Sequence, residues 1–415
     1  MSTKDFTKMK EKGVPDCDKQ DKPIHLLELF GGIGAPRRAL ENTIAEMVRI
    51  KNPTATKKEL REMSARYVKS IDYVEVLPFA VQAYNQMFDL SNRPQDIRLW
   101  NLSVDILVHG SPCQDYSREG KNDINSGRSI LYERTLQILD PNPAIGYPEL
   151  TRQPKIVIWE NVPNMAYSHP DILENYLKTM ESYGYTNTFC GSKKYLEKGG
   201  YSSPRSIMVD HMITASDYGT PQARDRFFCV SVLDMYAGAY GAFKMPDPIP
   251  VQDRYTLKQF LDLTVSLNDP SLQFTPTELA ITKKVNNQWY VKQAVKGDFG
   301  AGPGYVPVNE YQRVDFAFPN SQNRRGRVGD YASTITTSPR QGVLIGDTFR
   351  QFSAKEKLRL MGFRDGDYDN MKKSGLTDTQ VSHLAGNSIC VPVLEHIFQA
   401  AFNQYPDLTA EMFAK

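Results

Sequence analysis

The stretch HLLELFGGIGA, residues His25–Ala35, decides the predicted fold. Its first half is almost wholly apolar, as in a buried strand, and its glycines mark a sharp turn into a helix where the backbone can approach a ligand closely. Further apolar runs alternate with helix-like stretches downstream, which is typical of a parallel sheet covered by helices on both faces. We therefore predict a doubly wound α/β fold with a cofactor-binding turn after its first strand.

The same alternation predicts the individual elements of this sheet. The expected strands are Ile24–Leu29, Ile71–Glu75, Ile106–His109, Ile156–Trp159 and Phe227–Val232. The expected helices are Pro36–Ile50, Phe79–Phe88, Arg128–Leu139 and Pro170–Tyr183. The charged segment Asn52–Lys69 is predicted to be an inserted helix, either a solvated face or a contact with a nucleic-acid backbone or partner. We assign it no function.

A chain of 415 residues exceeds what one core usually supports, so we expect two packed regions. Residues 1–22 are expected to be a flexible tail, 23–232 together with 379–415 a catalytic domain, and 233–378 a smaller, loop-rich domain rich in Pro, Gly, Asn and Gln. Near the end, one helical face is apolar, so this helix should pack back on the first domain. That face consists of Val393, Leu394, Ile397, Phe398, Ala401 and Phe402.

Composition narrows the class of protein. With 40% hydrophobic and 24% charged residues, and no apolar run near the ~20 residues of a membrane span, we expect a soluble protein of the cytoplasm. The five cysteines are scattered and lack CxxC spacing, so neither disulfides nor a metal site is expected. A net charge of +2 gives no indication of a nucleic-acid partner.

The glycine turn predicts where a cofactor binds. Phe30, Gly32, Ile33 and Gly34 should line the pocket, and Glu75, at the end of the next strand, could accept both ribose hydroxyls. The turn lacks both GxGxxG spacing and a Walker lysine, so a sulfonium cofactor fits better than a phosphate. A plain tight turn, and a structural ion pair for Glu75, remain the alternatives. Asp96 is a further candidate, for an adenine amino group.

A cysteine and an acid are predicted at the same sheet edge. The strand at Asp105–Gly110 leads into Ser111-Pro112-Cys113-Gln114, and the next strand ends at Glu160. A thiol beside a carboxyl group at a cofactor site indicates covalent catalysis with proton donation. Downstream, the segment Tyr218–Arg226 should bring Gln222, Arg224 and Arg226 to the same rim.

In this order, the motifs make the chain similar to the cytosine carbon-5 DNA methyltransferases of bacteria and phages. The motifs are Phe30–Gly34, Gly110–Gln114, Glu160–Val162, Gln222–Arg226, Phe352–Phe363 and Gly386–Ser388. The resemblance spans nearly the whole chain. It implies S-adenosylmethionine as cofactor and double-stranded DNA as partner.

The resemblance also implies a part for individual residues. Cys113 would be the nucleophile, Glu160 would contact ring nitrogen 3, and Arg226 would hold the ring oxygen. Gln114 and Arg224 are assigned to the same catalytic centre, and Pro112, Asn387 and Ser388 to the cofactor. Residues 117–128 resemble the loop that closes over a flipped base, so Ser117, Arg118 and Arg128 are expected to contact DNA.

The sequence departs from the family at two places. Val76 stands where many relatives carry an aromatic residue, and the loop after Cys113 is unusually charged through Arg118 and Glu119. These departures bear on cofactor affinity and on the energetics of the loop.

DNA recognition is expected in residues 233–322, with Arg324, Arg325 or Arg327 on phosphate. We expect the protein to be a monomer. It could belong to a system with a cognate restriction endonuclease, and its host would be a bacterium or a phage-infected bacterium. The alternatives are a tRNA cytosine-5 methyltransferase and a catalytically silent DNA-binding regulator; a small-molecule methyltransferase needs no recognition region of this size.

Overall fold

The computed structural model describes residues 23–97, 104–111, 131–141, 153–191, 195, 197, 199–337 and 341–413. The chain forms two compact units. Unit 1 comprises residues 1–213, 225–248 and 389–415, and unit 2 comprises 214–224 and 249–388. These bounds differ from the expected ones, because 214–224 and 379–388 group with unit 2 and 233–248 with unit 1. The expected tail, residues 1–22, lies outside the described residues.

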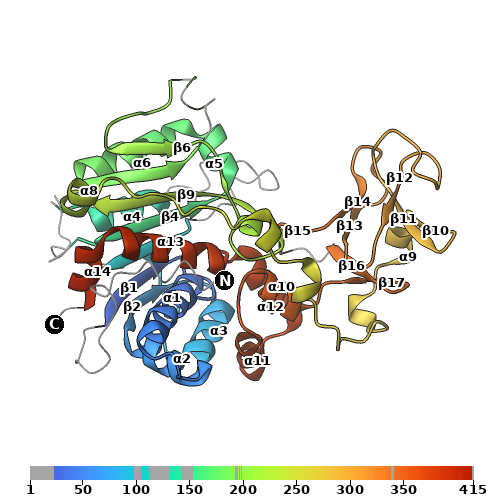
Figure 1. Ribbon diagram of the computed structural model, residues 1–415, viewed down its shortest axis with the longest axis horizontal. Coiled ribbons are helices and arrows are strands. Elements are labelled where there is room, and N and C mark those ends of the chain that lie inside the picture. The colour runs from blue at the N-terminus through green and yellow to red at the C-terminus, as the bar shows by residue number, and fades with distance from the viewer. Residues whose placement is uncertain are drawn as a thin grey trace. The chain divides into compact units, whose positions relative to one another are not determined.

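Unit 1 is built on one twisted sheet (Figure 1) with the strand order β2-β1-β3-β4-β9-β5-β6. Its strands are β1 (Ile24–Leu29), β2 (Val68–Val74), β3 (Ile106–His109), β4 (Ile156–Asn161), β5 (Tyr185–Cys190), β6 (Ser206–Val209) and β9 (Asp225–Leu233). The first four pair in parallel. All five predicted strands are present, and β1 and β3 have the predicted bounds.

Three strands of this sheet escaped prediction, β5, β6 and the two-residue β7 (Ile213–Thr214), which pairs with β9. One predicted strand, β9, runs the other way. β5, with the sequence YTNTFC, is fully buried although half of its residues are polar, so no apolar run marks it. β9 is antiparallel to both β4 and β5, which corrects the expectation of a parallel strand. No α-helix lies between β6 and β9, and an antiparallel strand needs no crossover helix.

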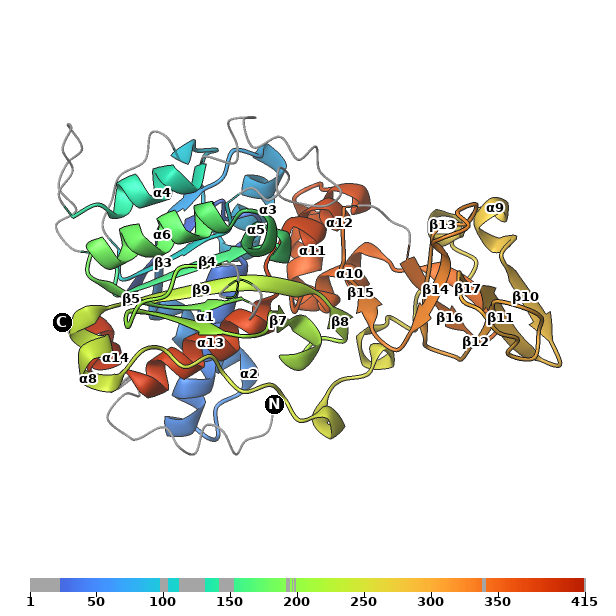
Figure 2. The ribbon, with the colours of Figure 1, turned by 90° about the horizontal axis from the view of Figure 1, so that it is seen from above.

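Helices cover both faces of this sheet, as predicted. Figures 1 and 2 show α4 and α6 on one face and α1 and α13 on the other. The helices of unit 1 are α1 (Ala35–Lys51), α2 (Lys57–Arg66), α3 (Pro78–Phe88), α4 (Leu131–Leu139), α5 (Pro163–Ser168), α6 (Pro170–Ser182), α8 (Asp234–Tyr240), α13 (Val391–Gln404) and α14 (Pro406–Phe413). Proline in the first turn fixes the start of α1, α3 and α6.

Two other helix predictions have different outcomes. The inserted helix is shorter than expected. α2 begins directly after its N-cap Thr56, which forms a capping box with Glu59, and it ends at Arg66. Val68 and Lys69 already belong to β2. The C-terminal prediction is confirmed: all six apolar residues of the predicted face are buried in α13, which packs on α1 within unit 1.

Unit 2 is dominated by antiparallel sheets. One has the order β10-β11-β12 and a second β14-β13-β16-β17, whereas β8 and β15 form a short parallel pair. The strands are β10 (Thr282–Val285), β11 (Gln288–Lys292), β12 (Tyr305–Val308), β13 (Arg313–Phe318), β14 (Arg325–Gly329), β16 (Gln341–Ile345), β17 (Thr348–Gln351), β8 (Gln222–Ala223) and β15 (Ala332–Ser333). Their shared core consists of Phe274, Val291, Val308, Val314, Phe316, Leu344 and Phe349.

In unit 2, α10, α11 and α12 form one group, whereas α9 lies apart from them beside β13 (Figure 2). These helices are α9 (Pro276–Leu279), α10 (Ala354–Leu360), α11 (Asp365–Lys373) and α12 (Asp378–Asn387), with short 3-10 turns at Ala215–Asp217, Val251–Asp253, Leu257–Phe260 and Pro270–Leu272. In the described part of the chain, no helix has the length and apolarity needed to cross a membrane.

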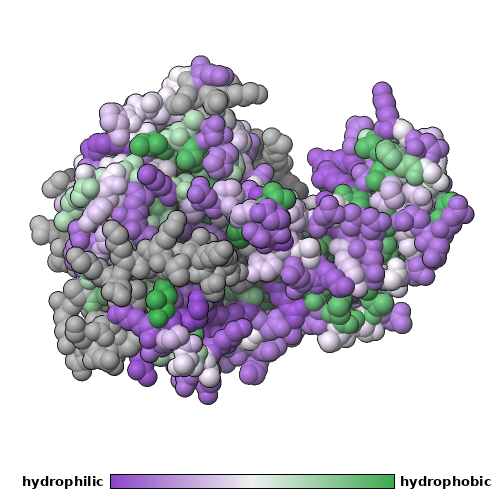
Figure 3. All heavy atoms as spheres, viewed as in Figure 1, coloured by the Kyte–Doolittle hydropathy of each residue, from purple (hydrophilic) through white to green (hydrophobic). Residues whose placement is uncertain are grey.

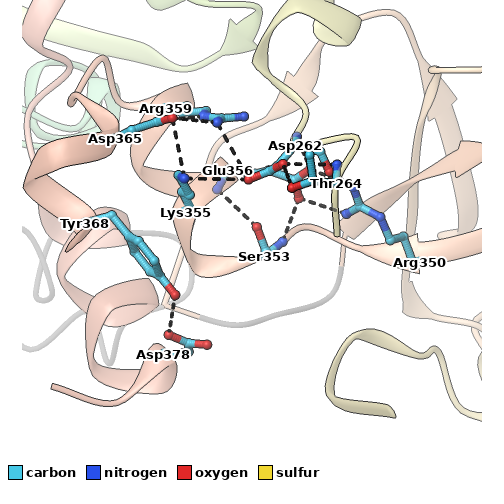
Figure 4. A network of polar contacts seen from close by, with 10 residues as sticks. All are labelled: Asp262, Thr264, Arg350, Ser353, Lys355, Glu356, Arg359, Asp365, Tyr368 and Asp378. Carbon is cyan, nitrogen blue, oxygen red and sulfur yellow. Dashed lines mark hydrogen bonds and ion pairs between the residues drawn. The ribbon is translucent and has the colours of Figure 1, made fainter. Parts of the chain in front are cut away.

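A buried ion pair connects β17 to α10 (Figure 4). Arg350 and Glu356 have fully buried side chains and form two hydrogen bonds, at 2.8 and 2.7 Å. The Glu356 carboxylate also accepts the backbone N–H groups of Ser353 and Asp262, each at 2.8 Å. The sequence identified the motif Phe352–Phe363 only by resemblance. Its residue Glu356 stabilises the structure of unit 2 through these contacts.

Candidate functional site

The turn between β1 and α1 has the backbone conformation that the sequence predicted. Phe30, Gly32 and Gly34 have φ angles of 57°, 54° and 75°. A Cβ on Gly34 would lie 2.5 Å from a ring atom of Tyr84, so this position requires glycine on two grounds. A Cβ on Gly32 would meet nothing within 4 Å, so the turn faces open space there. Ile33, in contrast, has its side chain fully buried.

Glu75 lies directly against this turn. Its carboxylate accepts the backbone N–H of Gly32 at 3.1 Å and those of Val76 and Leu77 at 2.9 and 3.0 Å. Tyr73 donates its hydroxyl proton to the Gly32 carbonyl, and burial raises the pKa of Tyr73 far above its usual range, so it stays a donor. The predicted pair of turn and acidic residue is therefore brought together, although α2 separates them in sequence.

The segment that carries Asp96 also reaches this place. The backbone N–H of Gln95 donates to the Glu75 carbonyl at 2.9 Å, and Ile97 is buried. Next to Glu75, the Val76 side chain is 58% exposed and offers an apolar surface beside the acidic group. Gly32, Glu75, Val76 and the Asp96 segment form one candidate cofactor site in unit 1.

Glu28 is a buried acid of this region that the sequence analysis did not single out. It accepts the backbone N–H of Arg37, in the first turn of α1, at 3.0 Å and the hydroxyl of Tyr84 at 2.5 Å. Burial raises its pKa to about 7 despite these hydrogen bonds. The signal that could have found it is a single carboxylate inside the apolar strand IHLLEL.

The second part of the site is at the carboxyl end of β4. Glu160 Oε1 lies 3.0 Å from Arg226 Nε, with side-chain exposures of 11% and 15%. A Cβ on Gly110 would lie 3.4 Å from Glu160 Oε2, so this carboxylate lies beside the residue that follows β3. The pairing of Asn161 with Phe227 puts Arg226 just beyond the end of β4. A parallel β9 would have placed Arg226 at the opposite edge of the sheet.

Several predicted residues lie in unit 2. The guanidinium of Arg224 donates to the carbonyls of Ile335, Gly386 and Ser388 at 3.0, 3.2 and 2.7 Å. These hydrogen bonds join a loop to the end of α12. Asn387 is exposed and lies 3.0 Å from His383 Nε2, whereas Ser388 is buried. The catalytic part assigned to Arg224 and the cofactor part assigned to Asn387 and Ser388 stay predictions.

Gln222 holds the same loop of unit 2. Its side-chain amide donates to the Leu360 carbonyl at 2.8 Å and accepts the backbone N–H of Ile335 at 2.9 Å. Because this side chain is fully buried, its hydrogen bonds fasten the loop to α10.

Other predicted residues are outside the described part of the chain. They are Pro112, Cys113, Gln114, Ser117, Arg118 and Arg128. The described cysteines are buried, and burial raises the pKa of Cys190 and Cys229 to about 12, so those two thiols are poor nucleophiles near neutral pH. No cluster of His, Cys, Asp or Glu among the described residues could hold a metal ion.

The arginine cluster lies at an irregularity of the β13–β14 pair. Phe318 faces Arg325 after a register shift, and Arg325 has a φ angle of 40°. Arg324 and Arg327 are exposed, and the Arg324 guanidinium lies 4.7 Å from the centre of the Phe318 ring. Among the coloured residues of Figure 3, hydrophilic ones predominate, with smaller hydrophobic patches between them.

Comparison with known proteins identifies relatives along most of the chain. The model of the C-5 cytosine-specific DNA methylase family matches residues 24–403. The type II methyltransferase M.HaeII of Haemophilus aegyptius is 24% identical, over 94% of this chain and 97% of its own length. The orphan methyltransferase M.SssI of Spiroplasma monobiae is 23% identical, over 92% and 97%.

Solved structures agree in fold. The Dnmt2 methyltransferase of S. pombe matches with a TM-score of 0.53 and 15% identity, over 91% of this chain and 98% of its own. A putative DNA modification methyltransferase encoded within an E. coli prophage matches with a TM-score of 0.52 and 17% identity, over 92% and 99%. At these identities the likeness shows the fold alone.

Proposed function

The chain belongs to the C-5 cytosine-specific DNA methylase family, and from this we propose that it transfers a methyl group from S-adenosylmethionine to carbon 5 of a flipped cytosine in duplex DNA. One observation carries the proposal for this particular chain. The acid–guanidinium pair of Glu160 and Arg226 lies against Gly110, three residues before Cys113. An acid and a cation thus lie at one edge of the sheet, where α/β folds bind their ligands, and we propose that Cys113 acts there as the thiol nucleophile.

The cofactor site fits an adenosine that carries a methionine. Glu75 would accept a ribose hydroxyl, and the exposed Val76 side chain would pack on the adenine ring. Gly32 leaves open space where the ligand would approach the backbone. The positive end of the α1 helix dipole favours a carboxylate near the start of that helix. Bound there, S-adenosylmethionine supplies an electrophilic methyl group.

The protein's residues would then activate the cytosine. Carbon 5 is a weak nucleophile until the Cys113 thiolate adds to carbon 6 and makes the ring enamine-like. Glu160 would donate a proton toward ring nitrogen 3, where charge gathers during this addition, and Arg226 would hold the ring oxygen. After methyl transfer, loss of the proton from carbon 5 expels Cys113 and frees the product.

Arg224 and Asn387 take different parts in this proposal. The buried Arg224 guanidinium links the backbone at Ile335 to the backbone at Gly386 and Ser388, all within unit 2. Such contacts suit a positioning residue. Asn387 has an exposed side chain that can meet a ligand. Recognition of a DNA sequence belongs to the strands of unit 2, and methylation of RNA remains the alternative that a direct comparison of duplex DNA with tRNA would separate.

The cellular context follows from the same family. We propose that the chain works as a monomer in the cytoplasm of a bacterial or phage-infected cell, with or without a cognate restriction endonuclease. Bisulfite sequencing of host DNA after expression tests whether this protein methylates cytosines in cellular DNA, and it identifies the target sequence. Uniformly unmethylated cytosines in the presence of folded protein would contradict DNA as the substrate.

Covalent catalysis is tested with Cys113→Ser. The exchange is nearly isosteric, so folding and DNA binding should persist while methyl transfer nearly disappears. With 5-fluorocytosine at the target, the native protein should form a stable adduct, because fluorine replaces the proton that must leave, and peptide mapping should locate it on Cys113. Near-native methylation by Cys113→Ser would end this mechanism for the chain.

A further inference from the structure

The hydrogen-bond ladder between β3 and β4 stops just before the site. Its last pair is His109 with Trp159. Side chains alternate along strands, so Gly110 and Glu160 face one side of the sheet, while Ser111 and Asn161 continue the other side, occupied by His109 and Trp159. Between His109 and Ser111, the last described residue of this segment, no further ladder pair with β4 fixes the chain.

Side-chain hydrogen bonds take the place of the ladder there. The Ser111 hydroxyl oxygen accepts from Trp159 Nε1 at 3.2 Å and from Asn161 Nδ2 at 3.2 Å. The same Asn161 nitrogen lies 3.3 Å from the Ser111 carbonyl oxygen. Asn161 Oδ1 accepts the backbone N–H of Val162 at 2.8 Å, which fixes the orientation of the amide. Residues on both sides of Glu160 therefore hold Ser111.

The two donors are themselves fixed. Trp159 is fully buried, and its ring packs 4.3 Å from Tyr176 and 5.3 Å from Phe227, measured between ring centres. Asn161 is 1% exposed and Ser111 is 3% exposed. An indole N–H can only donate, so without the Ser111 hydroxyl it would be a buried donor lacking its partner.

We propose that Ser111 is a positioning residue: through Trp159 and Asn161 its hydroxyl sets where the segment bearing Cys113 leaves β3 relative to Glu160. Each of these residues is close in sequence to Glu160 or Cys113, the proposed acid and nucleophile. Trp159 and Asn161 precede and follow Glu160, and Ser111 is two residues before Cys113. The inference rests on the proposed role of Cys113 as nucleophile.

Ser111→Ala tests the inference, since it removes the shared acceptor with little change in volume. We expect kcat to fall about 10- to 100-fold, as small displacements of reacting groups do, with the KM values for DNA and S-adenosylmethionine within about twofold of native. The rate of adduct formation on 5-fluorocytosine DNA should fall in proportion. Ser64→Ala is the matched control: Ser64 is 1% exposed, and its hydroxyl donates to the Arg61 carbonyl within α2, away from the proposed site.

Trp159→Phe is the second variant, because it removes the N–H donor and keeps an aromatic ring. Its kcat should fall as well, and the double variant Ser111→Ala/Trp159→Phe should lose less than the product of the two single losses. Native adduct rates in Ser111→Ala, or losses that multiply independently, would overturn the positioning role alone. If the native protein formed no adduct, the proposed mechanism would fail and this inference with it.

Discussion

Arg226 Nε lies 3.0 Å from Glu160 Oε1, and this contact depends on the direction of one strand. Arg226 is near the start of β9 and Glu160 near the end of β4. Only because β9 runs antiparallel to β4 do these two ends meet. The direction of β9 therefore decides which side chains meet at this edge of the sheet, and both side chains are largely withdrawn from water.

Arg226→Ala should lower kcat by about 10²- to 10³-fold, the cost of removing one preorganised charge from a reacting centre. The KM for S-adenosylmethionine should stay near its native value, since the cofactor site is at β1 and β2. Steady-state methylation of duplex DNA measures both. Arg205→Ala is the control, because Arg205 pairs with Asp234 at 40% and 41% exposure and should leave kcat unchanged. A native kcat in Arg226→Ala would contradict the assignment.

The sequence predicted β1, β3 and most of β4 well because these strands are largely apolar runs, whereas β2, with the sequence VKSIDYV, begins three residues before its predicted start. The bounds of β1 and β3 agree with the prediction. β5 was missed because its buried residues include Thr186, Asn187 and Thr188, whose hydrogen bonds form only in the folded protein. The direction of β9 depends on which strands it joins, and that is not encoded in its own residues.

The sequence predicted those site residues that directly follow a strand, because the end of a strand fixes where the next residues lie. Gly32 and Glu75 were expected together, and they share a hydrogen bond. Arg224 was assigned to the catalytic centre from its position in a motif, yet its described partners are backbone carbonyls of unit 2. Sequence cannot distinguish an arginine that meets a substrate from one that holds a loop.

Glu75→Gln should weaken cofactor binding selectively. The carboxylate accepts three backbone N–H groups on two oxygens, which leaves about one of its four acceptor sites, on Oε2, for a ribose hydroxyl. Loss of its charge should raise the KM for S-adenosylmethionine about 10- to 100-fold, the usual effect of losing hydrogen bonds to a charged group. DNA affinity should stay native in a gel-shift assay. Glu62→Gln, in the exposed face of α2, should change neither quantity, and equal KM values for both variants would return Glu75 to a purely structural role.

Arg324→Ala and Arg327→Ala should each weaken DNA binding regardless of sequence. Both side chains are exposed beside the irregular β13–β14 pair. Removing a cation that binds one phosphate should reduce the slope of log affinity against log salt by about 1. Lys178→Ala, an exposed cation of α6 paired with Glu174, serves as the control. Slopes that match the native protein in both arginine variants would exclude phosphate binding by these residues.

Glu28 should make stability depend on pH. Its pKa is about 7 in the folded protein against 4.5 ordinarily, because burial disfavours the carboxylate. Between these values the unfolded chain loses the proton and the folded chain keeps it. The stabilisation is therefore full below pH 4.5 and declines by up to about 3 kcal/mol as pH rises to 7. Urea unfolding of the native chain and Glu28→Gln at about pH 5 and about pH 7.5 measures the difference, and parallel pH profiles would contradict it.

Arg350→Met should destabilise unit 2 far more than an exposed ion-pair variant. It leaves the fully buried Glu356 carboxylate without its guanidinium, which typically costs about 3–5 kcal/mol. Arg359→Met, in the same network (Figure 4), removes a pair with Asp365 at 21% and 47% exposure and should cost at most about 1 kcal/mol. Arg350→Met/Glu356→Leu should recover part of the loss, but not all of it, because Glu356 also accepts the N–H groups of Ser353 and Asp262. Urea denaturation compares the three, and equal losses for Arg350→Met and Arg359→Met would show that burial does not set the strength of this pair.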